Sequence, residues 1–482
     1  MSELDDEHAA QLGRMLDVFP EARELGGRFA AAGHELYLVG GAVRDTLLAA
    51  GDASVVDQLD LDFATSARPD ETERIVRPWA SAVWLTGSEF GTVSCEHAAA
   101  DGRKRIVEIT TFRSDAYTPG SRHPQVEFGE TIEGDLARRD FTMNAMAVRV
   151  PEFRFVDLFG GLSDLNARRL RTPIDPHTSF SDDPLRMLRL ARFAARFDAT
   201  VDDDTYTAAQ LLAPRLDDIS AERIRDELVK LICSPHPDVG INLVLALGLD
   251  PWVIPELRPL RECADPMHRH KDVYRHTLAV IRNTMELEGD QPDFTLRMAA
   301  LLHDIAKPQT RRIHDDGTVS FLHHDMEGAR VAQRRMEELR FDRKTTNDVA
   351  DLVRMHLRFH TYRQGWTDSA VRRYVRDAGP LLERLNALTR ADVTTGNQRR
   401  ANAIQRRMDE LEERIDILRE QEELDRLRPP IDGNQIMAHL GIPPGKDVGR
   451  AWNHLLELRI ERGSMTEEEA LQELDEWWAG QE

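Results

Sequence analysis

Apolar and polar positions follow two different patterns along the chain. Up to about residue 170, short apolar runs alternate with amphipathic stretches, which predicts a region that mixes strands and helices. From about residue 184, apolar residues recur with helical spacing almost without interruption, so we expect the remainder to be helical. The strands expected in the first region are Leu36–Val39, Leu59–Ala64, Thr92–Cys95, Arg105–Thr111 and Ala145–Val150.

Two features subdivide the helical part. The proline clusters Pro235–Pro237 and Pro255–Pro259 should break helices and act as linkers. Within residues 397–428, apolar residues with 4-3-4-3 spacing form a seam of about two heptads. This seam either packs on the chain's own body or forms a dimer contact. Its members are Ile404, Met408, Leu411, Ile415 and Leu418.

Composition narrows the class of protein. A chain of 482 residues suggests about three domains. The 63 basic and 85 acidic residues give a formal charge of −22, which argues against generic nucleic-acid binding but not against a local basic face. Three scattered cysteines fit a reducing compartment rather than a disulfide framework. Residues 1–8 are acidic and polar, unlike a signal peptide, and apolar runs stay short of a membrane span. We expect a cytoplasmic protein.

Two carboxylates, Asp60 and Asp62, stand in the strand-like run Leu59–Ala64. Residues i and i+2 of a strand point to the same face, roughly 6–7 Å apart along the chain. Such close carboxylates repel one another unless a divalent cation lies between them, and Mg²⁺ prefers oxygen ligands. The pair therefore predicts a metal site, against the simpler alternative of a solvated strand edge.

The segment upstream of this pair favours the metal site. A short buried strand, Leu36–Val39, runs into Gly40-Gly41 and then into a helical pattern that contains Arg44. Glycines allow close approach of the backbone, and a helix N-terminus offers free N–H groups to a phosphate. Arg44 would add charge to this cradle. The alternative is an ordinary turn with a surface arginine.

A third candidate site surrounds the helix that follows Pro184. Arg186, Arg189 and Arg192 recur every three residues, and Asp183 stands one turn before Arg186. An Asp and an Arg fixed on one helix could pair with the edge of a nucleobase and so replace a template. The alternative is a solvated arginine face with a capping Asp.

Four segments together resemble class II tRNA nucleotidyltransferases and bacterial poly(A) polymerases. The remainder of the chain resembles the C-terminal half of HD-domain members of that family, particularly the actinobacterial type. The resemblance rests on Leu38–Asp45 with Asp60-Leu61-Asp62, on Arg138–Met146, on Asp157–Gly161 with Asp164-Leu165, and on Asp182–Phe193. Asp182 stands where many members carry Glu, which preserves the charge.

The resemblance implies an α+β fold: a nucleotidyltransferase palm on a mixed sheet, then an all-α neck, body and HD domain. The expected boundaries are 1–170 for the head, 171–262 for neck and body, 263–396 for the HD domain and 397–482 for a helical tail. The implied reaction transfers CMP and AMP from CTP and ATP to the 3′ end of tRNA, with Mg²⁺ held by Asp60 and Asp62. The implied nucleotide-binding residues are Gly41, Arg44, Arg139, Asp183, Arg186, Arg189 and Arg192.

A second site is implied downstream. The order His276, His303-Asp304, Asp392 resembles the metal constellation of HD domains, in which imidazoles and carboxylates bind a divalent transition metal that can activate water. Further histidines could supplement it, namely His323, His324, His356 and His360.

Three other functions remain open at this point. They are a poly(A) polymerase, an HD-type phosphohydrolase whose N-terminal half binds RNA, and a non-catalytic RNA-binding protein. A complete loop at Glu108–Arg122 favours addition of the terminal A, and Phe90–Val93 lacks the basic residues common in poly(A) polymerases. Paired metal ligands argue against simple binding.

Overall fold

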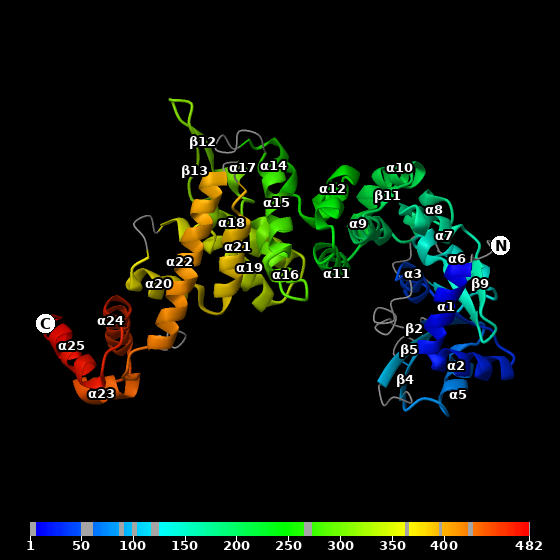
Figure 1. The fold of residues 1–482 in the computed structure, drawn as a ribbon, viewed down its shortest axis with the longest axis horizontal. Coiled ribbons are helices and arrows are strands. Elements are labelled where there is room, and N and C mark those ends of the chain that lie inside the picture. Colours follow the sequence, from blue (N-terminus) through cyan, green and yellow to red (C-terminus); the bar gives the residue numbers. More distant parts are fainter. Residues whose placement is uncertain are drawn as a thin grey trace. The chain divides into compact units, whose positions relative to one another are not determined.

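The computed structural model places the chain in two compact units, Met1–Trp252 and Val253–Glu482 (Figure 1). It describes residues 6–49, 61–85, 91–98, 104–116, 125–264, 272–361, 366–394, 398–422 and 428–481. The first unit contains a sheet and the second is mainly helical, which confirms the α+β prediction. No helix among these residues is long and apolar enough to cross a membrane.

A seven-stranded mixed sheet forms the head, in the order β3-β4-β5-β2-β1-β8-β9. Neighbouring strands are antiparallel except β2 and β5, which are parallel. The strands are β1 (Leu36–Val39), β2 (Leu61–Thr65), β3 (Ala82–Trp84), β4 (Thr92–Ala98), β5 (Lys104–Thr111), β8 (Met146–Val150) and β9 (Arg154–Asp157).

The sequence pattern predicts the central strands of the sheet but not its two edge strands. β1 has the predicted bounds, because four consecutive apolar residues buried on both faces give a clear signal. β3 and β9 were not predicted. They are three and four residues long and only partly buried, so each carries too few apolar positions for a pattern.

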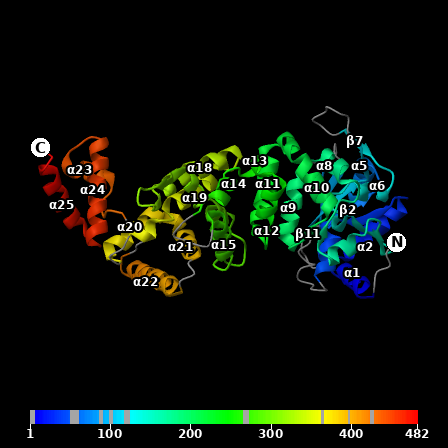
Figure 2. The same cartoon turned by 90° about the horizontal axis from the view of Figure 1, so that it is seen from above.

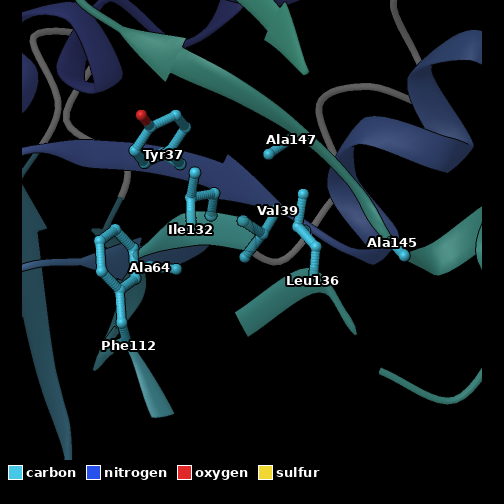
Figure 3. Packing of buried hydrophobic residues seen from close by; sticks show 8 residues of the cluster. All are labelled: Tyr37, Val39, Ala64, Phe112, Ile132, Leu136, Ala145 and Ala147. Atoms are coloured by element: carbon cyan, nitrogen blue, oxygen red, sulfur yellow. The ribbon is translucent and has the colours of Figure 1, made fainter. Parts of the chain in front are cut away.

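One core cluster fixes the sheet against α6 (Ile132–Ala137) (Figure 3). Tyr37 and Val39 alternate along β1 and so point to the same face. The ring of Tyr37 lies 6.0 Å from that of Phe112. Ile132 and Leu136 close the cluster from α6. Its remaining members are Ala64, Ala145 and Ala147.

After the head, the first unit continues as a mainly helical neck built around α9 (Leu185–Phe197). α9 packs against α11 (Ala221–Ile232) and α12 (Pro237–Leu247). The sequence suggested that the first proline cluster is a linker, but it lies inside the first unit, between two packed helices. Pro237 stands in the first turn of α12, where its missing N–H costs no helical hydrogen bond. The other neck helices are α8 (Pro176–Asp182) and α10 (Asp203–Leu212).

The second unit is a mainly helical body that also contains a β-hairpin. The hairpin joins β12 (Arg311–Ile313) to β13 (Val319–Phe321). Figures 1 and 2 show α18 (His324–Glu338) and α19 (Arg343–Met355) side by side. The other main helices of the body are α15 (Val273–Met285), α16 (Phe294–Leu302), α17 (Lys307–Thr310), α20 (Asp368–Ala378), α21 (Leu382–Ala391) and α22 (Gln398–Glu422).

The predicted apolar seam packs within the chain. Met408, Leu411, Ile415 and Leu418 are buried where α22 contacts α20 and α21, whereas Ile404 is only half-buried. This observation favours packing on the chain's own body over a dimer contact. The tail helices have a small core of their own. They are α23 (Gly433–Leu440), α24 (Lys446–Arg462) and α25 (Glu467–Ala479).

Candidate functional site

The predicted strand–glycine–helix cradle is present in the head. β1 leads into Gly40, whose φ of 68° and ψ of −127° suit glycine, and α3 (Gly41–Leu48) begins directly after it. A Cβ atom at position 40 would lie 2.9 Å from Nη1 of Arg139. The Arg139 guanidinium therefore lies against the backbone at the start of α3, where free N–H groups favour an anion.

A carboxylate pair stands on the two parallel strands. Asp62 on β2 lies directly opposite Glu108 on β5, so their side chains share one face of the sheet. Asp62 is half-buried and Glu108 is exposed. Asp60 lies outside the described residues, as do residues 117–122 of the predicted loop. The sequence predicts Glu108 within the strand Arg105–Thr111 and at the start of that loop, but not beside Asp62, because the β2–β5 register is not visible in the sequence.

Arg44 is buried and tied to two parts of the unit. Its Nε and Nη2 each lie 2.8 Å from a carboxylate oxygen of Asp45, and its Nη1 donates to the side-chain oxygen of Asn144. Its guanidinium also lies 5.4 Å and 5.1 Å from the ring centroids of Phe193 and Phe197 on α9. Arg44 therefore connects the cradle to the neck.

A buried carboxylate orders the arginines of the Arg138–Met146 motif. Arg138 and Arg139 pair with Asp135 on α6 at 2.8 Å and 3.1 Å. Burial by itself would raise the pKa of Asp135, but the two guanidiniums outweigh burial and lower it. Both arginines are therefore held in place by an ionised partner.

Asp140 joins this motif to the neck. It accepts hydrogen bonds of 2.8 Å from the Phe141 N–H and from Nδ2 of Asn144, and Nε of Arg189 on α9 lies 2.9 Å from its Oδ2. Burial opposes ionisation, but Arg189 and these donors lower the pKa of Asp140 to about 2. Arg189 reciprocally has a raised pKa, because Asp140 and Glu227 outweigh its own burial.

Asp183 and Arg186 do not stand on one helix, so that part of the sequence prediction was wrong. Asp183 is extended, with φ of −139° and ψ of 97°, and α9 begins only at Leu185. The residue before a proline is disfavoured in helical conformation, and Pro184 follows Asp183 directly. Asp183 pairs with Arg223 on α11 at 3.2 Å.

Arg186 is buried and bonded to the head. It donates to Oγ of Ser179 at 2.8 Å and to the carbonyl oxygen of Arg138 at 2.5 Å. Arg192, two turns further along α9, forms an ion pair with Glu227 at 2.8 Å. Burial lowers the pKa of Arg192 to about 10 despite the opposing effect of Glu227. The predicted arginines of α9 therefore all have protein partners.

The Asp157–Gly161 motif packs on the same region. The carboxylate of Asp157 accepts the N–H groups of Gly161 and Leu162 at 2.7 Å and 3.1 Å, at the start of α7 (Gly161–Asn166). A Cβ at Gly161 would lie 2.3 Å from the carbonyl oxygen of Thr142, so only glycine fits. Buried Asp164 accepts from the Thr142 hydroxyl at 2.7 Å. The motif thus braces the Arg138–Met146 segment.

The second unit brings the predicted HD residues together. Nε2 of His276 lies 3.2 Å from Nε2 of His303 and 2.9 Å from a carboxylate oxygen of Asp392. Asp304 Oδ2 is 3.2 Å from His303 Nε2 and 2.8 Å from Nζ of Lys307. His276 lies on α15, His303 and Asp304 directly follow α16, and Asp392 directly follows α21.

Two further histidines complete the cluster. Asp304 belongs to two sets of side chains that could hold a metal ion, His276–His303–Asp304 and Asp304–His324–His356. The sequence suggested both extra histidines together with His323 and His360, which belong to neither set among the described residues. His323 has φ of 61° and precedes α18, so the adjacent His324 turns inward instead.

The tautomers suit metal binding. Nδ1 of His303, His324 and His356 lies 2.8, 2.7 and 2.6 Å from the carbonyl oxygens of Ala300, Phe321 and Val353. A carbonyl only accepts, so each Nδ1 carries a proton and Nε2 is the ring atom left to bind a cation. Burial opposes protonation of His303, but Asp304 and Asp392 outweigh it and raise the pKa of that ring to about 9, so His303 would release its Nε2 proton when a cation binds. Burial, reinforced by nearby His303, lowers the pKa of His356 to about 4, so that ring stays neutral.

Comparisons with known proteins match each part of the chain. Residues 36–171 match the poly A polymerase head domain. Residues 198–260 match the probable RNA and SrmB- binding site of polymerase A, and residues 273–397 match the HD domain.

Curated relatives include an A-adding tRNA nucleotidyltransferase of Deinococcus radiodurans, 34% identical over 362 residues, which are 74% of this chain and 82% of that protein. A CCA-adding enzyme of Levilactobacillus brevis is 38% identical over 50% of this chain and 56% of that enzyme. The chain thus spans about half the length of the second relative.

Solved structures with the same fold include the CCA-adding enzyme of Bacillus stearothermophilus in complex with CTP, with a TM-score of 0.67 and 22% identity over 96% of this chain and 98% of that one. The Thermotoga maritima CCA-adding enzyme complexed with tRNA has a TM-score of 0.62 and 19% identity over the full length of both. Together with the Deinococcus relative, the three domain matches show that the chain belongs to the tRNA nucleotidyltransferase family with a poly A polymerase head domain, here joined to an HD domain.

Proposed function

We propose that the protein builds or repairs the CCA end of tRNA, taking CMP from CTP and AMP from ATP and releasing pyrophosphate. One observation carries the proposal. Arg186 of the neck donates to the carbonyl of Arg138, and the next residue, Arg139, lies against the backbone of Gly40. The residues suited to reading a base and those suited to holding a triphosphate therefore lie next to each other within one unit.

Each part of this region has a role in the proposed reaction. The tRNA 3′ hydroxyl attacks the α-phosphorus as its proton passes to water, the bond to pyrophosphate breaks, and the leaving group departs with its negative charge. Asp60 and Asp62, with Glu108 beside Asp62, would hold Mg²⁺, which lowers the pKa of the hydroxyl and offsets charge on the oxygens. Carboxylate oxygens are the donors that Mg²⁺ prefers, so this donor set fits.

The remaining residues bind and select the nucleotide. The N–H groups at Gly41 and the guanidinium of Arg139 hold the triphosphate. Buried Arg44 fixes the position of α3 through its hydrogen bond to Asn144. Asp183 offers a hydrogen-bond acceptor to the base edge, and Arg186 offers donors. For this, Asp183 releases Arg223 and Arg186 releases Ser179. Arg189 and Arg192 contribute positive charge to the nucleotide site from α9, where both form ion pairs with Glu227.

Three tRNA substrates test this proposal and separate it from its rivals. They end at the discriminator base, after one C, and after CC, and each is incubated with Mg²⁺ and with CTP, ATP or both. A CCA-adding enzyme extends the first two with CTP and the last with a single A. Extension of the third alone would indicate A addition, as in the name of the Deinococcus relative. Long tails from ATP alone would indicate a poly(A) polymerase.

We also propose a divalent transition-metal site in the HD domain. Its ligands are His276, His303, Asp304 and Asp392, with His324 and His356 on the other side of Asp304. Imidazole and carboxylate donors suit Zn²⁺, Ni²⁺, Co²⁺, Mn²⁺ or Fe²⁺. Such a metal would activate water for the hydrolysis of a phosphate ester. The converging Nε2 atoms favour this proposal.

Metal content tests the HD site directly. The parent, purified without chelator, should contain transition metal by mass spectrometry, and His303→Ala should lose it. His323→Ala is the matched control, because that imidazole is adjacent in sequence to a proposed ligand but lies outside both sets. Equal metal content in parent and His303→Ala would refute the site. Hydrolysis of bis-p-nitrophenyl phosphate then reports whether the loaded site is active.

Two broader inferences accompany these. We propose that the four sequence-defined regions, 1–170, 171–262, 263–396 and 397–482, are the functional divisions of the chain. We further propose a cytoplasmic location, which suits the three free cysteines and a tRNA substrate.

A further inference from the structure

We propose that Glu227, which lies outside the four segments that carry the family resemblance, is a positioning residue for nucleotide selection. It would act by fixing Arg189 and Arg192 of α9 and, through Arg189, the segment to which Arg186 is bonded. This inference rests on the proposed function and extends it to α11, which forms no part of the nucleotide cradle.

Glu227 is a buried carboxylate surrounded by cations. It is 4% exposed, and its two oxygens face three side chains. Oε2 lies 2.8 Å from Nε of Arg192, and Oε1 lies 3.4 Å from Nη1 of Arg189 and 3.9 Å from Nζ of Lys230. Ion pairs with a buried carboxylate at these distances restrict the positions of the two arginine side chains.

The contacts continue from Glu227 into the head. Arg189 bridges Glu227 to Asp140, and Asp140 accepts from Asn144, whose side-chain oxygen accepts from Arg44. A continuous series of side-chain contacts therefore runs from α11, through α9, to the arginine at the cradle.

The same series determines where Arg186 stands. Arg186 lies one turn before Arg189 on α9 and donates to the carbonyl of Arg138, two residues before Asp140. α9 is thus bonded to this short segment at two successive turns. A movement of Arg189 would shift the segment from Arg138 to Asp140, to which Arg186 is also bonded. The N–H donors of Arg186, which we propose to face the base, would then move as well.

Charge balance explains why Glu227 matters. Arg189 and Arg192 stand three residues apart on one helix, so their guanidiniums repel one another unless an anion lies between them. Loss of the Glu227 charge would leave Asp140 to balance Arg189 and would remove the carboxylate paired with Arg192. We expect Arg192 to turn toward solvent and Arg189 to lose one of its two anchors.

The test measures selectivity rather than activity alone. kcat/KM is determined for CTP, UTP, ATP and GTP on tRNA ending at the discriminator base and on tRNA ending in CC. For Glu227→Gln we expect the CTP:UTP and ATP:GTP ratios to fall about tenfold, within the range expected when one bidentate contact to a base edge is misplaced. KM for tRNA should remain unchanged, and Glu227→Asp should recover part of the selectivity.

Matched variants make the outcome decisive. Asp226→Asn removes the neighbouring, exposed carboxylate, which pairs with Arg225, and should keep the parental ratios. A folded Glu227→Gln with parental ratios, or with equal losses for all four nucleotides, would overturn the proposal. If that variant does not fold, Arg192→Lys takes its place, and unchanged ratios there would equally overturn it. Failure of the parent to add CCA would instead refute the proposed function, before any variant is compared.

Discussion

The Asp140–Arg189 pair should contribute measurably to the stability of the first unit. The pKa of Asp140 is about 2, against 3.8 for an unperturbed Asp. At about 1.4 kcal/mol per pKa unit, this difference favours the folded state by about 2 kcal/mol at neutral pH. Burial opposes this shift, and Arg189 is the largest of the groups that produce it, ahead of the hydrogen bonds from Asn144 and Phe141. We therefore expect a coupling free energy on the order of 2 kcal/mol between Asp140 and Arg189.

A double-mutant cycle measures this coupling. Asp140→Asn, Arg189→Gln and the double variant are unfolded in urea at pH 7, and the transition of the first unit gives each free energy of unfolding. The exposed pair Asp351–Arg354, at 3.0 Å, is the control, and its coupling should not exceed about 0.5 kcal/mol.

The pH dependence of the coupling gives a second check. The folded pKa of Asp140 lies below the unfolded pKa, so its contribution is complete above pH 3.8 or so and is lost as the pH falls toward about 2. We therefore expect equal coupling at pH 7 and pH 5 and a smaller coupling at pH 3. A coupling at pH 7 no larger than that of the surface pair would refute this account.

Three further substitutions have defined outcomes. Asp62→Ala should lower nucleotide addition about a thousandfold or more while tRNA binding, measured by filter retention, stays near the parental value, because a metal ligand acts mainly on the transition state; near-normal turnover would place the metal elsewhere. Gly40→Ala should destabilise the first unit by about 1–3 kcal/mol in thermal melting and raise KM for nucleotides, because Ala resists this backbone conformation and its Cβ would displace Arg139; Gly27→Ala, at a helical site with open space, is the control. His303→Ala should leave CCA addition within a few-fold of the parent, and loss of addition in a folded variant would show that the HD domain takes part in it.

Local features of the head could be predicted from the sequence. β1, Gly40 and α3 follow one another within about twelve residues, and each has its own signal: an apolar run, a paired glycine and a helical period. Pro184 also predicts the extended conformation of Asp183, whereas the helical spacing of the following arginines wrongly extends the helix to include it.

Contacts between distant segments could not be predicted. Glu108 faces Asp62 only because β5 pairs with β2 in parallel register. Glu227 lies 38 residues beyond Arg189 on a different helix, and nothing in its own neighbourhood distinguishes it from a surface glutamate. The choice of His324 over His323 depends on where α18 begins, which periodicity locates only to within a few residues.

The strand order of the head has a consequence for its dynamics and its solubility. β1 and β2, which carry the cradle and Asp62, each have a hydrogen-bonded neighbour on both sides, whereas the sheet ends at the short strands β3 and β9. Short edge strands offer few free N–H and C=O groups to another chain, which protects against edge-to-edge aggregation. Fraying begins at such edges, and opening the central strands requires that the sheet lose pairing on both flanks. Local opening at the margins therefore leaves the backbone beneath the cradle and the carboxylates in place.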